Sequence, residues 1–199
     1  MRETRYMAQA TRLYLDHALK PGLELSLGGD EAQYLGRVLR LRVGDRISVF
    51  NGRDGEFDAE LKAFAKKKVA LAVGERLFEP ASAPSESRLR LHLVQGISRG
   101  ERMDLVMQKA TELGVTAIQP VVTERGVVRL NEERRQQRHG HWQQVIISAC
   151  EQSGRRRIPE LAAPVDLPNW LGNSPGAGLL LDPLAAQSLP ELPPPEGQI

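Results

Sequence analysis

The sequence is poor in cysteine and in aromatic residues. Its 199 residues include one cysteine, Cys150, and aromatic residues make up 5% of the chain. A single cysteine cannot form an internal disulfide and supplies no thiolate cluster, so a reducing compartment is expected. The four histidines do not stand at ligand spacing with a cysteine or a carboxylate pair, and His139 and His141 alone are more typical of a surface. We therefore expect no metal site.

Long apolar runs are also missing. No segment approaches the roughly 18 consecutive apolar residues that a membrane-spanning helix needs. The first ten residues are charged and lack the apolar segment of a secretory signal. We expect a cytoplasmic location and no membrane partner.

The sequence contains none of three common enzyme motifs. It has no G-x-G-x-x-G, no G-x-x-x-x-G-K-[ST] and no G-x-S-x-G. Dinucleotide binding, P-loop chemistry and the hydrolase nucleophile elbow are therefore unsupported.

Basic residues are absent from the C-terminal part and dense before it. Leu161–Ile199 contains no lysine or arginine and four acidic residues, whereas Arg88–Arg157 contains thirteen basic residues, twelve of them arginine. Arginine binds phosphate bidentately and stacks on bases, which favours an RNA or DNA partner. A solvated arginine-rich surface is the alternative, because the net charge is only +2.

A proline- and serine-rich segment, Glu79–Ser87, predicts a linker between domains 1–78 and 88–199. Before it, short alternating strands and hairpin chemistry at Asn51–Gly55 predict a small β-barrel. Its expected strands are 12–15, 22–27, 46–50, 56–62 and 68–73. Asp30 is expected to cap a short helix whose buried side is formed by Ala32, Leu35, Val38 and Leu39.

After the linker, the sequence predicts a strand, a helix and a strand. Ser98 and Glu101 have the spacing of a capping box, and Gly114 stands where a helix ends. This order favours a parallel sheet. The buried stripe of the helix is expected to be Met103, Val106, Met107, Ala110 and Leu113.

Further along, we expect helices at 141–152 and around Trp170–Leu171, and an apolar strand at Ala177–Leu181. Arg155–Arg157 follow a glycine stop and form either a solvated loop or a phosphate-binding segment.

Three segments resemble the ribosomal RNA small subunit methyltransferase E family. Q-K-A-T-E-L-G-V-T-A-I-Q-P (Gln108–Pro120), followed by T-E-R (Thr123–Arg125), is similar to its signature. A-C-E-Q-S-G-R (Ala149–Arg155) is similar to the family's A-x-E-Q-S-x-R, and Tyr34–Asp45 is similar to its V-L-R-x-x-x-G-D block. The three motifs stand in the family's order across most of the chain.

The resemblance implies an α/β plus β fold, with an N-terminal PUA-like β-barrel and a C-terminal SPOUT-type α/β domain that ends in a trefoil knot. It also implies a homodimer that uses S-adenosyl-L-methionine to methylate N3 of a uridine in 16S rRNA. The family's G-P-E-G-G loop and L-G-x-R-x-L-R-x-E-T-A segment do not occur here. We therefore expect the knot segment to be missing or incomplete, the sequence to be cut short at Ile199, and cofactor binding by these 199 residues to be weak or absent.

The same resemblance suggests candidate site residues. Glu112 is a candidate general base for the uridine N3–H, and Lys109 or Arg155 is a candidate stabiliser of the uridinate. An ion pair between Glu112 and Lys109 would be the plain structural alternative. The candidate cofactor-binding residues are Leu181, Asp182 and Pro183. The candidate RNA contacts are Arg12, Arg37, Arg40, Arg125, Gln152 and Arg155. The alternative function is a non-catalytic RNA-binding or ribosome-associated protein.

Overall fold

The computed structural model describes residues 11–65, 68–79, 86, 89–124, 126, 131–173 and 178–192. The chain forms two compact units. The first comprises Met1–Ser85 together with Glu151–Arg157, and the second comprises Glu86–Cys150 together with Ile158–Ile199. Most of the expected linker lies outside the described residues. The return of Glu151–Arg157 to the first unit is a feature that a single division of the sequence at a linker does not include.

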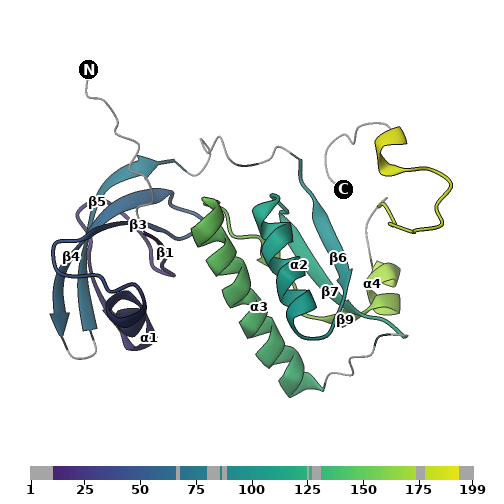
Figure 1. Cartoon of the computed structure of the whole chain (residues 1–199), viewed down its shortest axis with the longest axis horizontal. Helices are drawn as coiled ribbons and strands as arrows, with labels where there is room; N and C mark the ends of the chain where they lie inside the picture. The colour runs from purple at the N-terminus through teal and green to yellow at the C-terminus, as the bar shows by residue number, and fades with distance from the viewer. Residues whose placement is uncertain are drawn as a thin grey trace. The chain divides into compact units, whose positions relative to one another are not determined.

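The first unit is built on a five-stranded sheet with the order β1-β3-β4-β5-β2 (Figure 1). Its strands are β1 (Arg12–Tyr14), β2 (Glu24–Gly28), β3 (Arg46–Phe50), β4 (Glu56–Ala65) and β5 (Lys68–Phe78). Strands β1 and β3 are parallel, and the other neighbours are antiparallel. The curled sheet agrees with the expected N-terminal barrel. Strands β4 and β5 run several residues beyond their expected ends and form a long ribbon.

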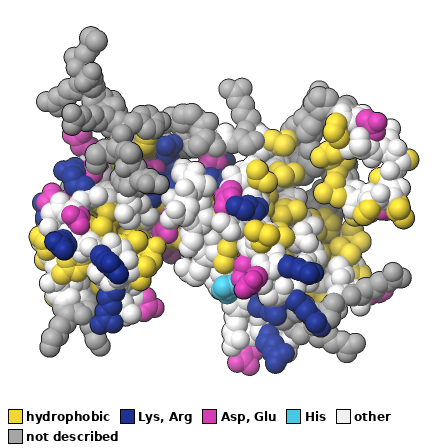
Figure 2. All heavy atoms as spheres, in the orientation of Figure 1, with side chains coloured by type: hydrophobic (Ala, Val, Ile, Leu, Met, Phe, Trp, Pro, Cys, Tyr) yellow, Lys and Arg dark blue, Asp and Glu magenta, His cyan; other side chains and the backbone are white. Residues whose placement is uncertain are grey.

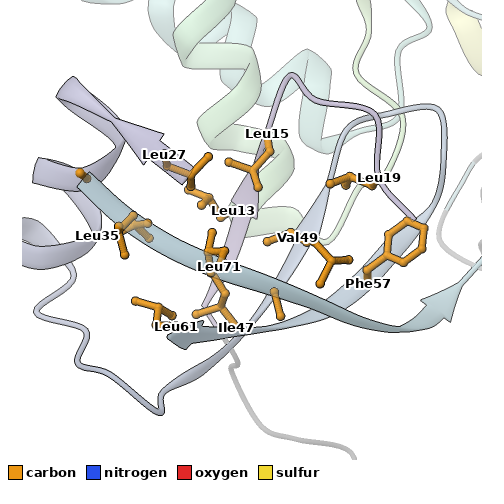
Figure 3. Close-up of a cluster of buried hydrophobic side chains, with 14 residues drawn as sticks. Leu13, Leu15, Leu19, Leu27, Leu35, Ile47, Val49, Phe57, Leu61 and Leu71 are labelled. Atoms are coloured by element: carbon orange, nitrogen blue, oxygen red, sulfur yellow. The ribbon is translucent and has the colours of Figure 1, made fainter. Parts of the chain in front are cut away.

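The sheet closes around one apolar core, shown in Figure 3. Ile47, Val49, Phe57, Leu61 and Leu71 alternate with more exposed residues along three strands and are at most 1% exposed. Full burial of such side chains contributes roughly 1.5–3 kcal/mol each. The period-two pattern of the sequence is therefore the pattern that builds this core.

The expected short helix forms in two parts. Helix α1 (Gly29–Gln33) continues into a π-helical turn, η1 (Tyr34–Val38), whose wider winding alters the buried face. Leu35 is fully buried, but Val38 is 64% exposed, so the predicted burial of Val38 was wrong. The predicted Asp30 cap was also wrong, because Gly28 occupies the cap position and no side chain caps the helix.

The second unit contains a parallel sheet in which β6 (His92–Gly96) and β7 (Ala117–Val122) are neighbours. Helix α2 (Glu101–Glu112) connects them, which confirms the expected strand–helix–strand unit (Figure 1). Two short strands also pair with β7 in parallel, β8 (Glu160–Leu161) and β9 (Val165–Asp166). Met103, Met107, Ile118, Trp142 and Ile146 form the centre of the core between this sheet and its helices.

Two local predictions for α2 were wrong. The residue before the helix is Gly100, at a φ of 54°, and no side chain caps it. This left-handed glycine turns the chain directly into the helix, so Ser98 lies too far back to act as the cap. Leu113 is 84% exposed, because it lies at the C-cap, after the last helical turn.

The remaining elements are α3 (Glu132–Ser153), α4 (Leu167–Asn173) and a 3₁₀ turn, η2 (Leu189–Glu191). Helix α3 begins nine residues before its expected start at 141, since the polar residues ahead of His141 continue the helix. The predicted strand at Ala177–Leu181 was wrong for its described part, Gly178–Leu181, which has no regular structure. A strand is held by hydrogen bonds to a neighbour, and among the described strands none pairs with this segment.

Candidate functional site

The segment Glu151–Arg157 is attached to the sheet of the first unit by one shared carboxylate. Glu56, at the start of β4, accepts hydrogen bonds at 3.0 Å from Arg12 Nε and from Arg156 Nε, one on each oxygen. Arg12 also donates to the backbone carbonyls of Glu151 and Arg155, each at 3.1 Å. The Glu56 side chain is only 5% exposed, so these ion pairs are largely shielded from solvent.

The two buried carboxyl groups of this cluster are shifted in opposite directions. Burial would raise the pKa of Glu56, but hydrogen bonds from Arg12 and Arg156 and the charge of Arg12 together lower it. Burial raises the pKa of Glu151, and its hydrogen bond from the Tyr14 backbone N–H at 2.9 Å offsets this only in part. Glu56 is therefore held as a carboxylate, whereas burial disfavours the charged form of Glu151.

This cluster contains two of the predicted RNA contacts, Arg12 and Arg155, both engaged inside the first unit. The side chain of Arg12 is 15% exposed and Arg155 is 3% exposed, so neither presents an open guanidinium to a ligand. The guanidinium of Arg156 packs on the Phe78 ring, 3.8 Å from the ring centroid. This contact is expected neither in a solvated loop nor at a residue that binds phosphate. Gln152, by contrast, is exposed. The RNA roles of Arg12, Arg155 and Gln152 stay predictions.

The other predicted RNA contacts of this unit, Arg37 and Arg40, are both exposed. They lie on the segment Tyr34–Gly44, which folds back on itself through a hydrogen bond from the Leu41 N–H to the Leu35 carbonyl at 3.0 Å. Arg42 is a further exposed arginine of this segment that the predicted contacts omitted. The mixture of arginine and apolar residues from 37 to 42 was the sequence pattern that indicated an exposed Arg42.

Formal charge is divided unevenly between the two units. The first unit contains 17 lysine and arginine residues against 13 acidic residues, a net charge of +4. The second contains 10 against 12, a net charge of −2. A polyanion is therefore attracted to the first unit, although the arginine-dense stretch of the sequence extends well into the second.

The predicted catalytic pair, Lys109 and Glu112, lies on the surface of α2. Lys109 Nζ and Glu112 Oε2 are 2.7 Å apart, and Gln108 donates to the other carboxylate oxygen at 2.9 Å. The hydrogen bond from Lys109 is the main cause that lowers the pKa of Glu112. The structure therefore contains the ion pair, and the catalytic roles stay predictions.

The predicted cofactor-binding residues, Leu181, Asp182 and Pro183, lie in an irregular and exposed segment. Leu181 is 79% exposed, and its neighbour Leu180 is 87% exposed. A nucleoside cofactor needs a concave site with polar groups that fix the adenine and the ribose. The described residues around 179–192 form an open, mainly apolar depression instead, so they do not by themselves fit S-adenosyl-L-methionine.

Arg125 lies outside the described residues. Within the part of the chain that the structure describes, no group of three or more histidine, cysteine, aspartate or glutamate residues could hold a metal ion. No helix among these residues is long and apolar enough to span a membrane.

Two protein families match the chain. A family described as an RNA methyltransferase domain matches residues 85–198, and a second, described as an RNA methyltransferase PUA domain, matches residues 27–73. The two matches fall on the second and the first unit, respectively.

Individual relatives give the same result. The chain is 28% identical over 163 residues to Ribosomal RNA small subunit methyltransferase E of Buchnera aphidicola subsp. Acyrthosiphon pisum, a match that covers 82% of the chain and 63% of that relative. It is 30% identical over 162 residues to the protein of that name in Rickettsia conorii, covering 80% of the chain and 62% of the relative. The chain thus spans less than two thirds of both curated relatives.

A solved structure is also similar. It is Ribosomal RNA small subunit methyltransferase E from Neisseria gonorrhoeae bound to S-adenosyl methionine, at 36% identity and a TM-score of 0.86. The match covers 96% of this chain and 78% of that chain.

Proposed function

The chain belongs to the ribosomal RNA small subunit methyltransferase E family. From this membership we propose that it takes part in the methylation of 16S ribosomal RNA, with S-adenosyl-L-methionine as the methyl donor. The observation that carries the proposal is the match of both units, one to an RNA methyltransferase domain and one to its PUA domain. The names of the relatives support 16S ribosomal RNA as the substrate. The cofactor in the Neisseria structure supports the methyl donor.

The proposed target atom is N3 of a uridine. This nitrogen carries a proton and is a poor nucleophile in the neutral imide, so methylation requires removal of that proton or stabilisation of the uridinate. We assign the first role to Glu112 and the second to Lys109. The cofactor, when bound, supplies an activated methyl group. The residues of this chain have to orient the uridine and either remove its N3 proton or stabilise the uridinate.

The RNA is proposed to bind the first unit. Its net positive charge and the exposed Arg37 and Arg40 support this placement, because phosphate contacts supply most of the affinity for RNA. Arg12, Arg155, Gln152 and Arg125 remain further candidates. We also propose a homodimer, which the family resemblance implies, and a cytoplasmic location, which the bacterial ribosomal RNA methyltransferases among its relatives support.

The test is methyl transfer to small ribosomal subunits isolated from cells that lack this modification. With labelled S-adenosyl-L-methionine, we expect incorporation into 16S ribosomal RNA, and mass spectrometry of the nucleosides should identify 3-methyluridine. Methylation of another base would contradict the assignment of N3. Leu105→Ala is a suitable control variant, because this side chain is 54% exposed on the helix that contains Lys109 and Glu112.

A second candidate is an RNA-binding protein without catalysis. It is favoured by one observation, the exposed and irregular segment at Leu181–Pro183. Binding of 16S ribosomal RNA with no methyl incorporation would select this candidate.

A further inference from the structure

The segment Tyr34–Gly44 lies over the outer part of β4 and touches it at two places. The Gly44 N–H donates to the Leu61 carbonyl at 2.8 Å. At the other end, a Cβ placed on Gly36 would lie 3.3 Å from Cε1 of Phe64. The ring of Phe64 therefore packs against bare backbone, and the absence of a side chain at residue 36 makes this approach possible.

Phe64 is not covered on its remaining surface. Phe64 is 36% exposed, and two apolar side chains of the segment Tyr34–Gly44 are more open, Val38 at 64% and Val43 at 59%. Figure 2 shows hydrophobic side chains beside lysine and arginine side chains over α1 and the neighbouring strands. Exposed apolar side chains on one short segment and on the strand it packs against are candidates for an interaction surface.

Three arginines of the segment, Arg37, Arg40 and Arg42, are exposed, and within the described residues none of them forms a side-chain ion pair. Other exposed arginines of this unit are neutralised, for example Arg46 by Asp58 and Arg53 by Asp16. Three cations without an ion pair, on the segment whose Gly36 packs against the Phe64 ring, are complementary to a nucleic-acid strand.

Arg40 has a second unusual property. Its φ is 55°, and it is the one residue other than glycine with a positive φ in the described chain. A side chain in the left-handed region costs free energy, and such strain gathers at functional positions. The π-helical turn at Tyr34–Val38 ends two residues before it, and π-turns are also frequent at functional sites.

We propose that Phe64 is a stacking platform for an unpaired base of the RNA, and that Arg37, Arg40 and Arg42 bind the phosphates on either side of that base. The inference rests on the proposed function, which makes RNA the partner. A base in a duplex is stacked on both faces, so the site selects a loop or another single-stranded segment.

The experiment uses the full chain and two fluorescein-labelled RNAs, a hairpin with an unpaired loop and a continuous duplex with the same number of phosphates. Fluorescence anisotropy should show that the wild-type chain prefers the hairpin. Phe64→Leu should weaken hairpin binding about tenfold and leave duplex binding unchanged, since only a stacked base loses its partner. Phe64→Tyr should bind as the wild type does, and so should the control Leu77→Ala, an exposed apolar residue on β5.

The possible outcomes separate this inference from the proposed function. Equal weakening on both RNAs, or no change with Phe64→Leu, would overturn the stacking site, while methyl transfer by the wild type would leave the proposed function in place. A wild-type chain that binds neither RNA would overturn the stacking site, whereas the absence of methyl transfer to 16S ribosomal RNA would overturn the proposed function. Circular dichroism and thermal unfolding check that each variant is folded. Should Phe64→Leu fail to fold, Arg37→Glu replaces it and must weaken binding of the hairpin.

Discussion

Arg156 donates a hydrogen bond to Glu56 across 100 residues of sequence, at 3.0 Å between Nε and Oε2. The guanidinium of Arg156 also lies 3.8 Å from the centre of the Phe78 ring. Arg12 donates to both oxygens of Glu56, from Nε to Oε1 at 3.0 Å and from Nη2 to Oε2 at 3.1 Å. One buried carboxylate therefore holds both the first strand and the returning segment Glu151–Arg157, which the sequence places far from the sheet.

Replacement of Glu56 by glutamine should destabilise the first unit by about 3–5 kcal/mol, because two guanidinium groups would lose a shielded negative partner. Urea unfolding measures this loss. Glu60→Gln is the matched control on the same strand, since its ion pair with Lys62 is open to solvent and should contribute nothing measurable. Equal effects of the two substitutions would contradict the shared role of Glu56.

Acid should weaken the same attachment. The folded-state pKa of Glu56 is lowered from its ordinary value of 4.5 by the net effect of its arginine partners, which outweighs burial. Its stabilising contribution is therefore complete above pH 4.5 and is lost as the pH falls through the lower folded-state pKa. Thermal unfolding from pH 7 to pH 3 should show this loss in the wild type and a flatter profile in Glu56→Gln.

Glu151 should show the opposite dependence. Burial raises its pKa above 4.5, so the group favours the folded state only while protonated and opposes it as the pH rises through the folded-state pKa. Glutamine retains an oxygen that can accept the Tyr14 N–H. We expect Glu151→Gln to raise the melting temperature at pH 7, with a gain that shrinks toward pH 4.5. A lower melting temperature at pH 7 would show that the charge of Glu151 is stabilising.

Arg40→Gly should weaken RNA binding without destabilising the fold. Glycine relieves the left-handed strain at a φ of 55°, so the free energy of unfolding should stay unchanged or rise by up to about 1 kcal/mol. Loss of one phosphate contact should weaken binding of both hairpin and duplex RNA and reduce the salt slope by about one. Arg40→Lys, which keeps charge and strain, is the control. RNA affinity that is unchanged at low salt would exclude a phosphate contact.

Local periodicity predicted the framework of both units, because the residues that decide it are close in sequence. The strand at Arg46–Phe50 and the parallel pair joined by α2 formed as expected. Burial of Val38 was predicted wrongly because a π-turn changes the face that a regular helix would bury. The partner of Arg156 could not be predicted, since a contact over 100 residues depends on the folded sheet.

The pair Lys109 and Glu112 gives a direct test of the proposed catalytic roles. Both side chains are on an exposed face of α2, so Glu112→Gln should leave the melting temperature unchanged. Removal of a general base should lower the rate of methyl transfer to 16S ribosomal RNA by about 10²–10⁴-fold. Lys109, by its hydrogen bond, keeps the pKa of Glu112 below 4.5, so Glu112 should stay ionised from pH 5 to pH 8 and add no step to the pH–rate profile. A wild-type rate of methyl transfer in Glu112→Gln, with the same rate in the control Leu105→Ala, would contradict the catalytic roles. Lys109 and Glu112 would then be only a solvated ion pair on the helix surface.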